Sequence, residues 1–181
     1  MARIVFIYGL VAGLIIIAGV IGTIAIGGDQ PHGNVWLGYL IMLLGMSAVF
    51  MGVKQHRDQA LGGVIKFLPA LGVGLAIALI ASLAYVLVWE AYLAATDYAF
   101  MDQYISASLE ARRAEGLTGE AYRELEAEMR SMAEQYQSPL FRLPVTFAEI
   151  FPVGLLVSLV SAALLRNPRF LPARGHVPPA R

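Results

Sequence analysis

The chain contains no cysteine, few charged residues and only three histidines. Charged residues occupy 14% of its 181 positions, against about 25% in soluble domains. The lack of cysteine excludes disulfides, thiolate metal sites and cysteine nucleophiles. The histidines lie in separate segments, and no His/Asp/Glu cluster has the spacing of a metal site. We therefore expect no metal and no cofactor.

Catalytic motifs are absent as well. The sequence has no P-loop and no Gly-x-Ser-x-Gly motif. The pair Gly62-Gly63 is more typical of a turn than of a phosphate site. The sequence points to no catalytic residue, so we expect a protein that is not an enzyme and does not bind nucleic acid.

Four long apolar runs dominate the chain. They cover residues 4–26, 35–53, 67–89 and 143–165. About 20 helical residues cross the hydrocarbon core of a bilayer, so each run is long enough to span it. The first run exceeds the ~7–15-residue core of a signal peptide, and no Ala-x-Ala site follows it, which favours a retained anchor. The predicted fold is an all-α integral membrane protein, with residues 1–166 as a four-span domain in the lipid bilayer.

The charges between the spans are sorted by side. With the N-terminus inside, the cytoplasmic side carries eight basic residues and Asp58 as its only acid. The outer side carries eleven acids and five arginines. This sorting follows the positive-inside rule, so both termini are expected in the cytoplasm. The basic cytoplasmic edge is also a candidate contact for anionic lipid.

Residues 90–142 form the one sizeable segment outside the predicted spans. The sequence predicts an extracytoplasmic amphipathic helical hairpin there, with a break at Gly116 and Thr118 as the N-cap of the second helix. An apolar seam with spacings of three and four residues runs along that second helix: Tyr122, Leu125, Met129, Met132 and Tyr136. The seam either closes the hairpin internally or serves as a docking face for a protein partner or for self-association.

The C-terminal residues 167–181 combine four prolines with arginines. Such a composition cannot form a packed element and favours an extended chain near anionic headgroups. We predict a disordered cytoplasmic tail.

Several groups of residues together resemble a known family. They are Ile7–Gly13 in the first span, Arg57–Ile65 after the second, Ala114–Thr118 and Ser138–Phe141 in the outer insert, and Phe151–Leu156 in the fourth span. The combination resembles the bacterial four-span membrane proteins of the domain of unknown function 4199 family over nearly the whole chain. The resemblance implies a bacterial origin and, with the spans, an inner-membrane location. It implies no catalytic residues, and the proline- and arginine-rich tail looks like an addition.

One carboxyl lies inside a predicted span. Glu149 is six residues into the fourth run, about 9 Å deep at ~1.5 Å per residue, and an ionisable residue there is a functional hypothesis by default. Pro152 has no N–H and frees the carbonyl of Ala148. Because Glu90 closes the third run at a similar depth, we treat Glu149, Glu90 and Pro152 as a candidate intramembrane polar site. The alternative is that Glu149 is hydrated near the interface or pairs with Arg142, and that Glu90 is a solvated helix end.

Small residues recur at helical spacing in two spans. They are Ala70, Gly74, Ala78 and Ser82 in the third run, and Gly9 and Gly13 in the first. Small residues at this spacing let membrane helices approach closely, either within one bundle or across a dimer.

Two functional hypotheses follow. The leading one is a non-enzymatic scaffold or accessory subunit that acts by packing with partners or with itself. The alternative is a small transporter or channel subunit with a polar path around Glu149. The orientation of Glu149 discriminates between them, because a polar path requires that carboxyl to face the bundle.

Overall fold

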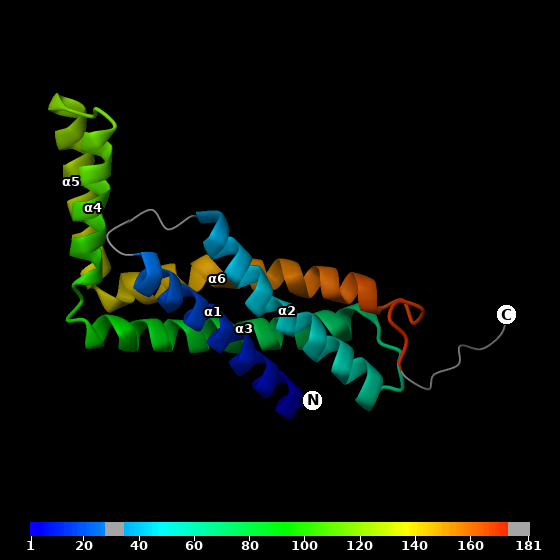
Figure 1. The fold of residues 1–181 in the computed structure, drawn as a ribbon. Coiled ribbons are helices and arrows are strands. Elements are labelled where there is room, and N and C mark those ends of the chain that lie inside the picture. The colour runs from blue at the N-terminus through cyan, green and yellow to red at the C-terminus, as the bar shows by residue number, and fades with distance from the viewer. Residues whose placement is uncertain (28–34, 174–181) are drawn as a thin grey trace.

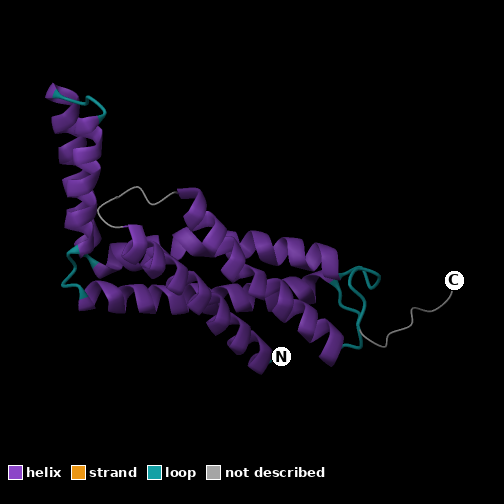
Figure 2. Ribbon diagram, viewed as in Figure 1, coloured by secondary structure: helices purple, strands orange, loops and turns teal. Residues whose placement is uncertain are grey.

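Helices make up nearly all of the described chain. The computed structural model describes residues 1–27 and 35–173, which form six helices and no strand (Figures 1 and 2). In chain order they are α1 (Ala2–Gly27), α2 (Val35–Ala60), α3 (Phe67–Ala95), α4 (Phe100–Ala114), α5 (Gly119–Gln137) and α6 (Pro139–Leu165). The last part of the predicted tail, residues 174–181, lies outside the described residues.

Four of these helices are long and apolar enough to cross a membrane. The candidate spans are Ala2–Thr23, Trp36–Ala60, Phe67–Ala95 and Pro139–Leu165. The all-α, four-span prediction is therefore confirmed. Several helices extend beyond the predicted apolar segments into polar residues, because backbone hydrogen bonding continues past the last apolar side chain. Among the charged residues that thereby become helical are Glu90 near the end of α3 and Arg142 in the first turns of α6.

The four long helices lie together in one bundle. Helix α3 packs against α1, α2 and α6, and α2 also packs against α1 and α6. The N-terminus and the C-terminal segment lie at one end of this bundle (Figure 1). Helices α4 and α5 lie at the other end and stand crosswise to the long helices.

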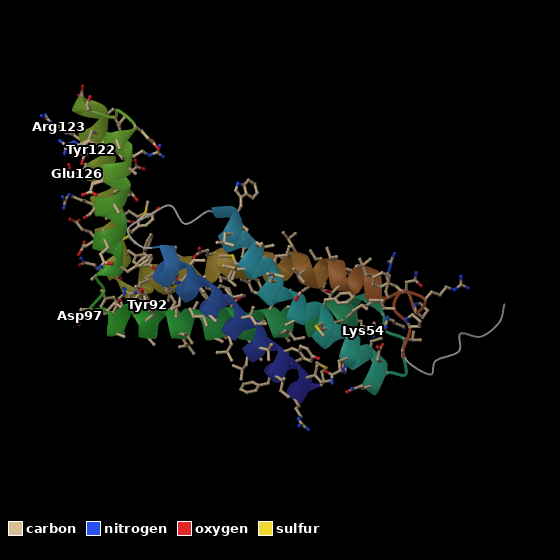
Figure 3. All side chains as sticks on the ribbon, in the orientation of Figure 1. Lys54, Tyr92, Asp97, Tyr122, Arg123 and Glu126 are labelled. Carbon is tan, nitrogen blue, oxygen red and sulfur yellow. The ribbon has the colours of Figure 1, made fainter. Side chains whose placement is uncertain are left out.

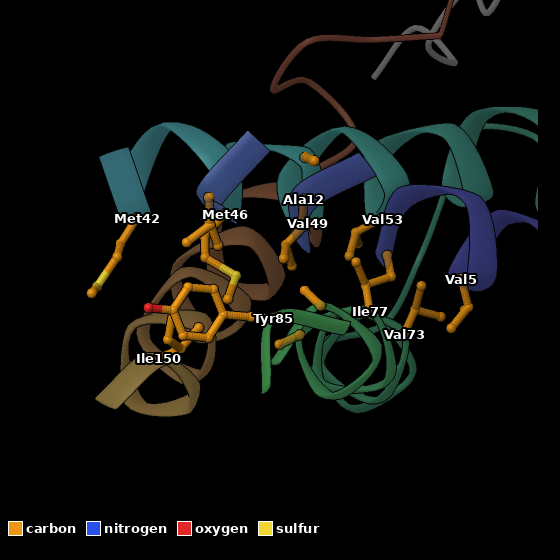
Figure 4. Close-up of a cluster of buried hydrophobic side chains, with 14 of the residues drawn as sticks. Val5, Ala12, Met42, Met46, Val49, Val53, Val73, Ile77, Tyr85 and Ile150 are labelled. Carbon is orange, nitrogen blue, oxygen red and sulfur yellow. The ribbon is translucent and has the colours of Figure 1, made fainter. Parts of the chain in front are cut away.

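The bundle interior is filled with apolar side chains. Met46, Val49 and Val53 of α2 face Ile77 of α3 across a cluster that also takes in Ala12 of α1 (Figure 4). All five are fully shielded from solvent. The buried serines of the interior return their hydroxyls to their own helices: Ser82 donates to the carbonyl of Ala78, Ser158 to that of Gly154 and Ser161 to that of Val157.

Small residues set the distance between α3 and its neighbours. A Cβ added to Gly74 would lie 2.9 Å from the Cβ of Ser158 in α6, and one added to Gly154 would lie 2.7 Å from the Cβ of Ala78. On the other side of α3, a Cβ added to Gly9 of α1 would lie 2.6 Å from the Cβ of Ile80, and one added to Gly13 would lie 2.9 Å from the Cβ of Ala84. Ala70, Ala78 and Ser82 are fully buried. The predicted small-residue stripes therefore pack within one bundle.

Helices α4 and α5 pack side by side as a hairpin. Gly116 lies in the turn between them with a φ of +94°, a conformation that glycine adopts without a Cβ clash. Thr118 takes the N-cap position of α5, although its side chain makes no capping hydrogen bond. Ile105 and Leu109 of α4 are buried, and α5 is the helix that covers α4.

The predicted seam of α5 is only half-buried. Its residues at positions 122, 125, 129 and 136 are partly covered, whereas Met132 is 53% exposed. Near the tip, the guanidinium of Arg113 in α4 lies 5.5 Å from the ring centroid of Tyr122. Part of the seam thus faces α4, and part is open.

The close approach of α3 and α6 makes a matched pair of substitutions informative. Gly74→Val should destabilise the protein by about 1–3 kcal/mol, because its side chain would overlap Ser158. Gly72→Val is the control: it lies in the same helix with nothing within 4 Å of an added Cβ, so it should leave the melting temperature in detergent nearly unchanged. Equal melting temperatures for the two variants would contradict this packing.

Candidate functional site

A buried arginine joins the hairpin to the bundle. The side chain of Arg142 lies at the start of α6, and the residue is only 2% exposed. Its Nε donates to Oε2 of Glu90 at 2.8 Å, and its Nη2 pairs with Oε1 of the same carboxylate. Its Nη1 donates to the carbonyls of Tyr136 and Gln137 at 2.8 and 3.1 Å. These carbonyls belong to the last turn of α5, which has no intrahelical donors for them, so Arg142 caps α5 while it binds α3.

Aromatic rings surround this ion pair. The guanidinium of Arg142 lies 4.9 Å from the ring centroid of Tyr98 and 5.8 Å from that of Tyr136. The Tyr98 hydroxyl donates to Oε1 of Glu90 at 3.0 Å, and this hydrogen bond raises the pKa of Tyr98 above its ordinary value. The indole N–H of Trp89 donates to the Tyr136 hydroxyl at 3.0 Å. We call these five residues, Trp89, Glu90, Tyr98, Tyr136 and Arg142, the junction cluster.

The turn that carries Tyr98 has a strained backbone. Asp97 and Tyr98 have φ angles of +50° and +56°. The left-handed region costs an L-residue roughly 1–2 kcal/mol, and two consecutive non-glycine residues there are unusual. The Tyr98 N–H is held by the carbonyl of Leu93 at 2.8 Å. The turn thus places the Tyr98 ring on Arg142 and its hydroxyl on Glu90, which offsets part of the strain.

A cleft of about 400 Å³ opens beside the junction cluster. Leu93, Met101 and Pro139 give it apolar walls, and Asp97 and Asp102 give it an acidic rim. Arg142 also lines it, but four of the five guanidinium N–H donors already bind Glu90 and the α5 carbonyls. The cleft therefore does not present an open cation for an anionic ligand.

The structure separates the three predicted polar-site residues. Glu90 belongs to the junction cluster and binds Arg142. Glu149 lies on the exposed side of α6 and makes no hydrogen bond or ion pair with any residue that the structure describes. Neither the expected approach of the two carboxyls nor the alternative pairing of Glu149 with Arg142 is formed, since Arg142 is occupied by Glu90. Pro152 is also exposed, and α6 continues through it.

A second buried arginine lies at the opposite end of the bundle. Arg57, in the last turn of α2, is fully buried. Its Nε donates to Oδ1 of Asp58 at 2.7 Å, while Nη1 and Nη2 donate to the carbonyls of Phe170 and Leu171. The ring of Phe170 packs edge-on against Phe50, with centroids 6.4 Å apart. The carboxylate of Asp58 also pairs with Lys54, which Figure 3 shows at this end.

We call the bonds of Arg57 to Phe170 and Leu171 the C-terminal clamp. This clamp changes the expected start of the C-terminal tail. The sequence predicts disorder from Asn167, but residues 166–173 form turns that fold back against α2. The reason is that Arg57, once buried, needs acceptors that its own helix cannot supply. The composition of the tail gave no sign of a contact that depends on backbone carbonyls.

The pairing of Arg142 with Glu90 could have been inferred from local conflicts in the sequence. An arginine at a helix N-terminus and a glutamate near a helix C-terminus both oppose the helix dipole. In antiparallel spans three and four, these two residues fall at the same end of the bundle. Residues that break a local rule often satisfy a tertiary one. The sequence prediction places Arg142 in the outer segment 90–142 and does not include its pairing with Glu90.

The fold, the junction cluster and the C-terminal clamp together define a class of protein. It is an all-helical membrane protein with four spans and a helical hairpin between the last two. Residues 7–167 match the family described as protein of unknown function (DUF4199). The chain belongs to this family, as its resemblance indicated. No curated protein and no solved structure matches it.

The buried ion pair predicts a large effect from one substitution. Arg142→Met should destabilise the protein by about 3 kcal/mol, because it leaves the Glu90 carboxylate and the α5 carbonyls without donors. Arg130→Met is the matched control. It removes the exposed, one-turn ion pair with Glu126 and should leave the melting temperature nearly unchanged, because water and salt screen an exposed pair. Thermal unfolding in one detergent checks both, and equal shifts would contradict a structural role for the junction cluster.

Proposed function

We propose that this protein is a non-enzymatic, multi-pass protein of the bacterial inner membrane that serves as an accessory subunit. Its outer hairpin, α4–α5, docks another protein. The observation that carries the proposal is the junction cluster, because it holds an exposed, highly charged hairpin in a fixed, crosswise position on a membrane bundle. A hairpin held in this way is suited to presenting a surface to a partner.

The orientation is part of the proposal. Arg3 lies at the start of α1, Lys54 and Arg57 near the end of α2, Lys66 just before α3 and Arg166 just after α6. These helix ends lie at the bundle end that holds the two described ends of the chain (Figure 1). The positive-inside rule assigns this end to the cytoplasm. The hairpin then lies outside, and the basic edge meets the anionic lipid of the inner leaflet.

The chemistry of the hairpin indicates a basic partner surface. Helices α4 and α5 and their turn carry eight acidic and four basic residues. Two of the arginines already pair within the hairpin, Arg112 with Glu115 and Arg130 with Glu126. Glu124 and Glu128 are exposed one turn apart on α5. Like charges at this spacing repel one another, and a basic partner would relieve that repulsion.

The transport hypothesis has less support. Between the junction cluster and the C-terminal clamp, the interior of the bundle is filled by apolar side chains and by serines that are hydrogen-bonded to their own helices. Glu149, which would line a polar path, is exposed on α6 and makes no hydrogen bond or ion pair with a described residue. Proton or cation flux through proteoliposomes of the purified protein, lost in Glu149→Gln, would favour transport over docking.

Topology can be tested with single cysteines, because the chain has none of its own. Glu128→Cys in α5 should react with an impermeant maleimide in spheroplasts. Leu61→Cys, in the turn after α2 at the opposite end of the bundle, should react only after permeabilisation. Both residues are exposed, so accessibility within the protein does not differ. The reverse labelling pattern would contradict the proposed orientation.

Docking can be tested by photo-crosslinking in native membranes. A photoreactive residue at Glu124 or Glu128 should yield a protein adduct of one size from both positions. The control is Leu87, which is 70% exposed on the membrane-spanning part of α3 and should yield no protein adduct of that size.

Charge reversal makes the test specific. A crosslinker at Glu124 should lose its adduct when Glu128→Lys is added, because the partner surface is expected to be basic. Arg123→Glu is the opposite change on the same helix and should leave the adduct in place. Hairpin positions that yield no protein adduct in native membranes would refute the docking function.

A further inference from the structure

The exposed side of α6 carries two polar groups that lack a hydrogen-bond partner among the described residues. Glu149 is exposed there and makes no bond with a described residue. Pro152 has no N–H, so the carbonyl of Ala148 lacks its helical donor. Ala148 and Pro152 are exposed on the same side of α6. A hydrogen-bonding side chain and an unpaired acceptor therefore lie next to each other on the surface.

This polar pair lies well within the candidate span Pro139–Leu165. Arg142 marks the level of the junction cluster, and Glu149 follows seven residues later, about 10 Å further along the helix. A glutamate side chain is too short to span that distance back to the interface. Lipid tails offer no hydrogen bonds, and an ionised carboxylate in hydrocarbon is so costly that the group takes up a proton. Glu149 then presents an O–H donor beside an unused carbonyl acceptor.

The residues around the pair have the spacing of a helix–helix seam. Val145, Glu149, Pro152, Leu156, Leu159 and Ala163 follow one another at intervals of four and three, and all six are exposed. This is the spacing with which two nearly parallel helices interlock. The opposite face of α6, with Ile150, Gly154 and Ser158, is buried in the bundle. Helix α6 thus has one seam that packs in its own bundle and a second seam that is exposed.

We infer that this face of α6 binds the same face of a second copy of the chain. Two copies in one membrane share the same orientation, so a twofold axis along the bilayer normal brings the two α6 helices together in parallel. The carboxyl of each copy can then donate to the Ala148 carbonyl of the other. A donor and an acceptor on one face make that face complementary to itself, as a twofold interface requires. This interface is independent of the hairpin, so either proposal can fail alone.

Disulfide crosslinking of single-cysteine variants in membranes tests the interface. Leu156→Cys on the seam should form a disulfide-linked dimer under mild oxidation. Leu87→Cys, on α3, should not, although Leu87 is 70% exposed and Leu156 is 62% exposed. A Leu156→Cys protein that stays monomeric, or that crosslinks only to a different protein, would overturn the inference.

Substitutions at Glu149 test the role of its hydrogen bond. Energy transfer between donor- and acceptor-labelled copies in liposomes, diluted with lipid, gives the association constant. Glu149→Leu removes the donor and should weaken association about tenfold, a loss in the range of two interhelical hydrogen bonds. Glu149→Gln keeps a donor and should associate nearly as well as the unchanged protein. Pro152→Ala restores the helical donor to the Ala148 carbonyl and should weaken association in the same direction.

The same variants separate a lost interface from a lost fold. Because Glu149 lies outside the bundle core, Glu149→Leu and Glu149→Gln should melt at the same temperature as the unchanged protein in a detergent that keeps it monomeric. Association of Glu149→Leu as strong as that of Glu149→Gln would overturn the inference. The hairpin photo-crosslinks are scored separately, and their presence in the Glu149→Leu variant would leave the docking function standing.

Discussion

A buried guanidinium must find acceptors for its five N–H donors, and this requirement shapes both ends of the protein. Each arginine found buried in the described chain binds one carboxylate and two backbone carbonyls. Arg57 takes its carboxylate from the next residue and its carbonyls from the distant segment after α6. Arg142 takes its carboxylate from the distant helix α3 and its carbonyls from the end of the preceding helix. Arg142 draws the end of α5 onto α3, and Arg57 draws the segment after α6 onto α2. Without these bonds each charge would be buried and uncompensated, at a cost of several kcal/mol. The two ends of the bundle are therefore held by directional hydrogen bonds and ion pairs, which apolar packing cannot provide.

Between these ends, the bundle depends on close backbone approach. Lipid tails are as apolar as leucine, so helix association in a membrane gains from tight contact rather than from leaving water. Gly74 and Gly154 face Ser158 and Ala78, and there is no room for a further methyl group at either glycine. The serines at this contact satisfy their hydroxyls within their own helices, which leaves the contact free of unpaired polar groups.

Much of this fold could be predicted from the sequence because its main features are local. The spans follow from uninterrupted apolar runs, and the division of the hairpin follows from a glycine and the period of the α5 seam. The junction cluster and the C-terminal clamp could not be read in this way. Each depends on residues that are distant in sequence, such as Arg142 and Glu90, and partly on backbone carbonyls, which have no sequence signature. The small-residue stripes predict close helix packing, either within one bundle or across a dimer. Only the structure shows that the contacts lie within one bundle.

The direction in which Glu149 points was also beyond the reach of sequence. The same glutamate could line a path or face lipid, depending on a rotation of α6 of about half a turn. That rotation is fixed by Gly154 and Ser158, whose small side chains select the face that meets α3. Once that face is chosen, Glu149 and Pro152 lie on the exposed part of α6. The small residues Gly154 and Ser158 therefore determine both the close packing of the bundle and the exposure of the polar groups on its surface. In the proposed dimer, the α6 helix of the second copy supplies the acceptor for the Glu149 donor and the donor for the Ala148 carbonyl.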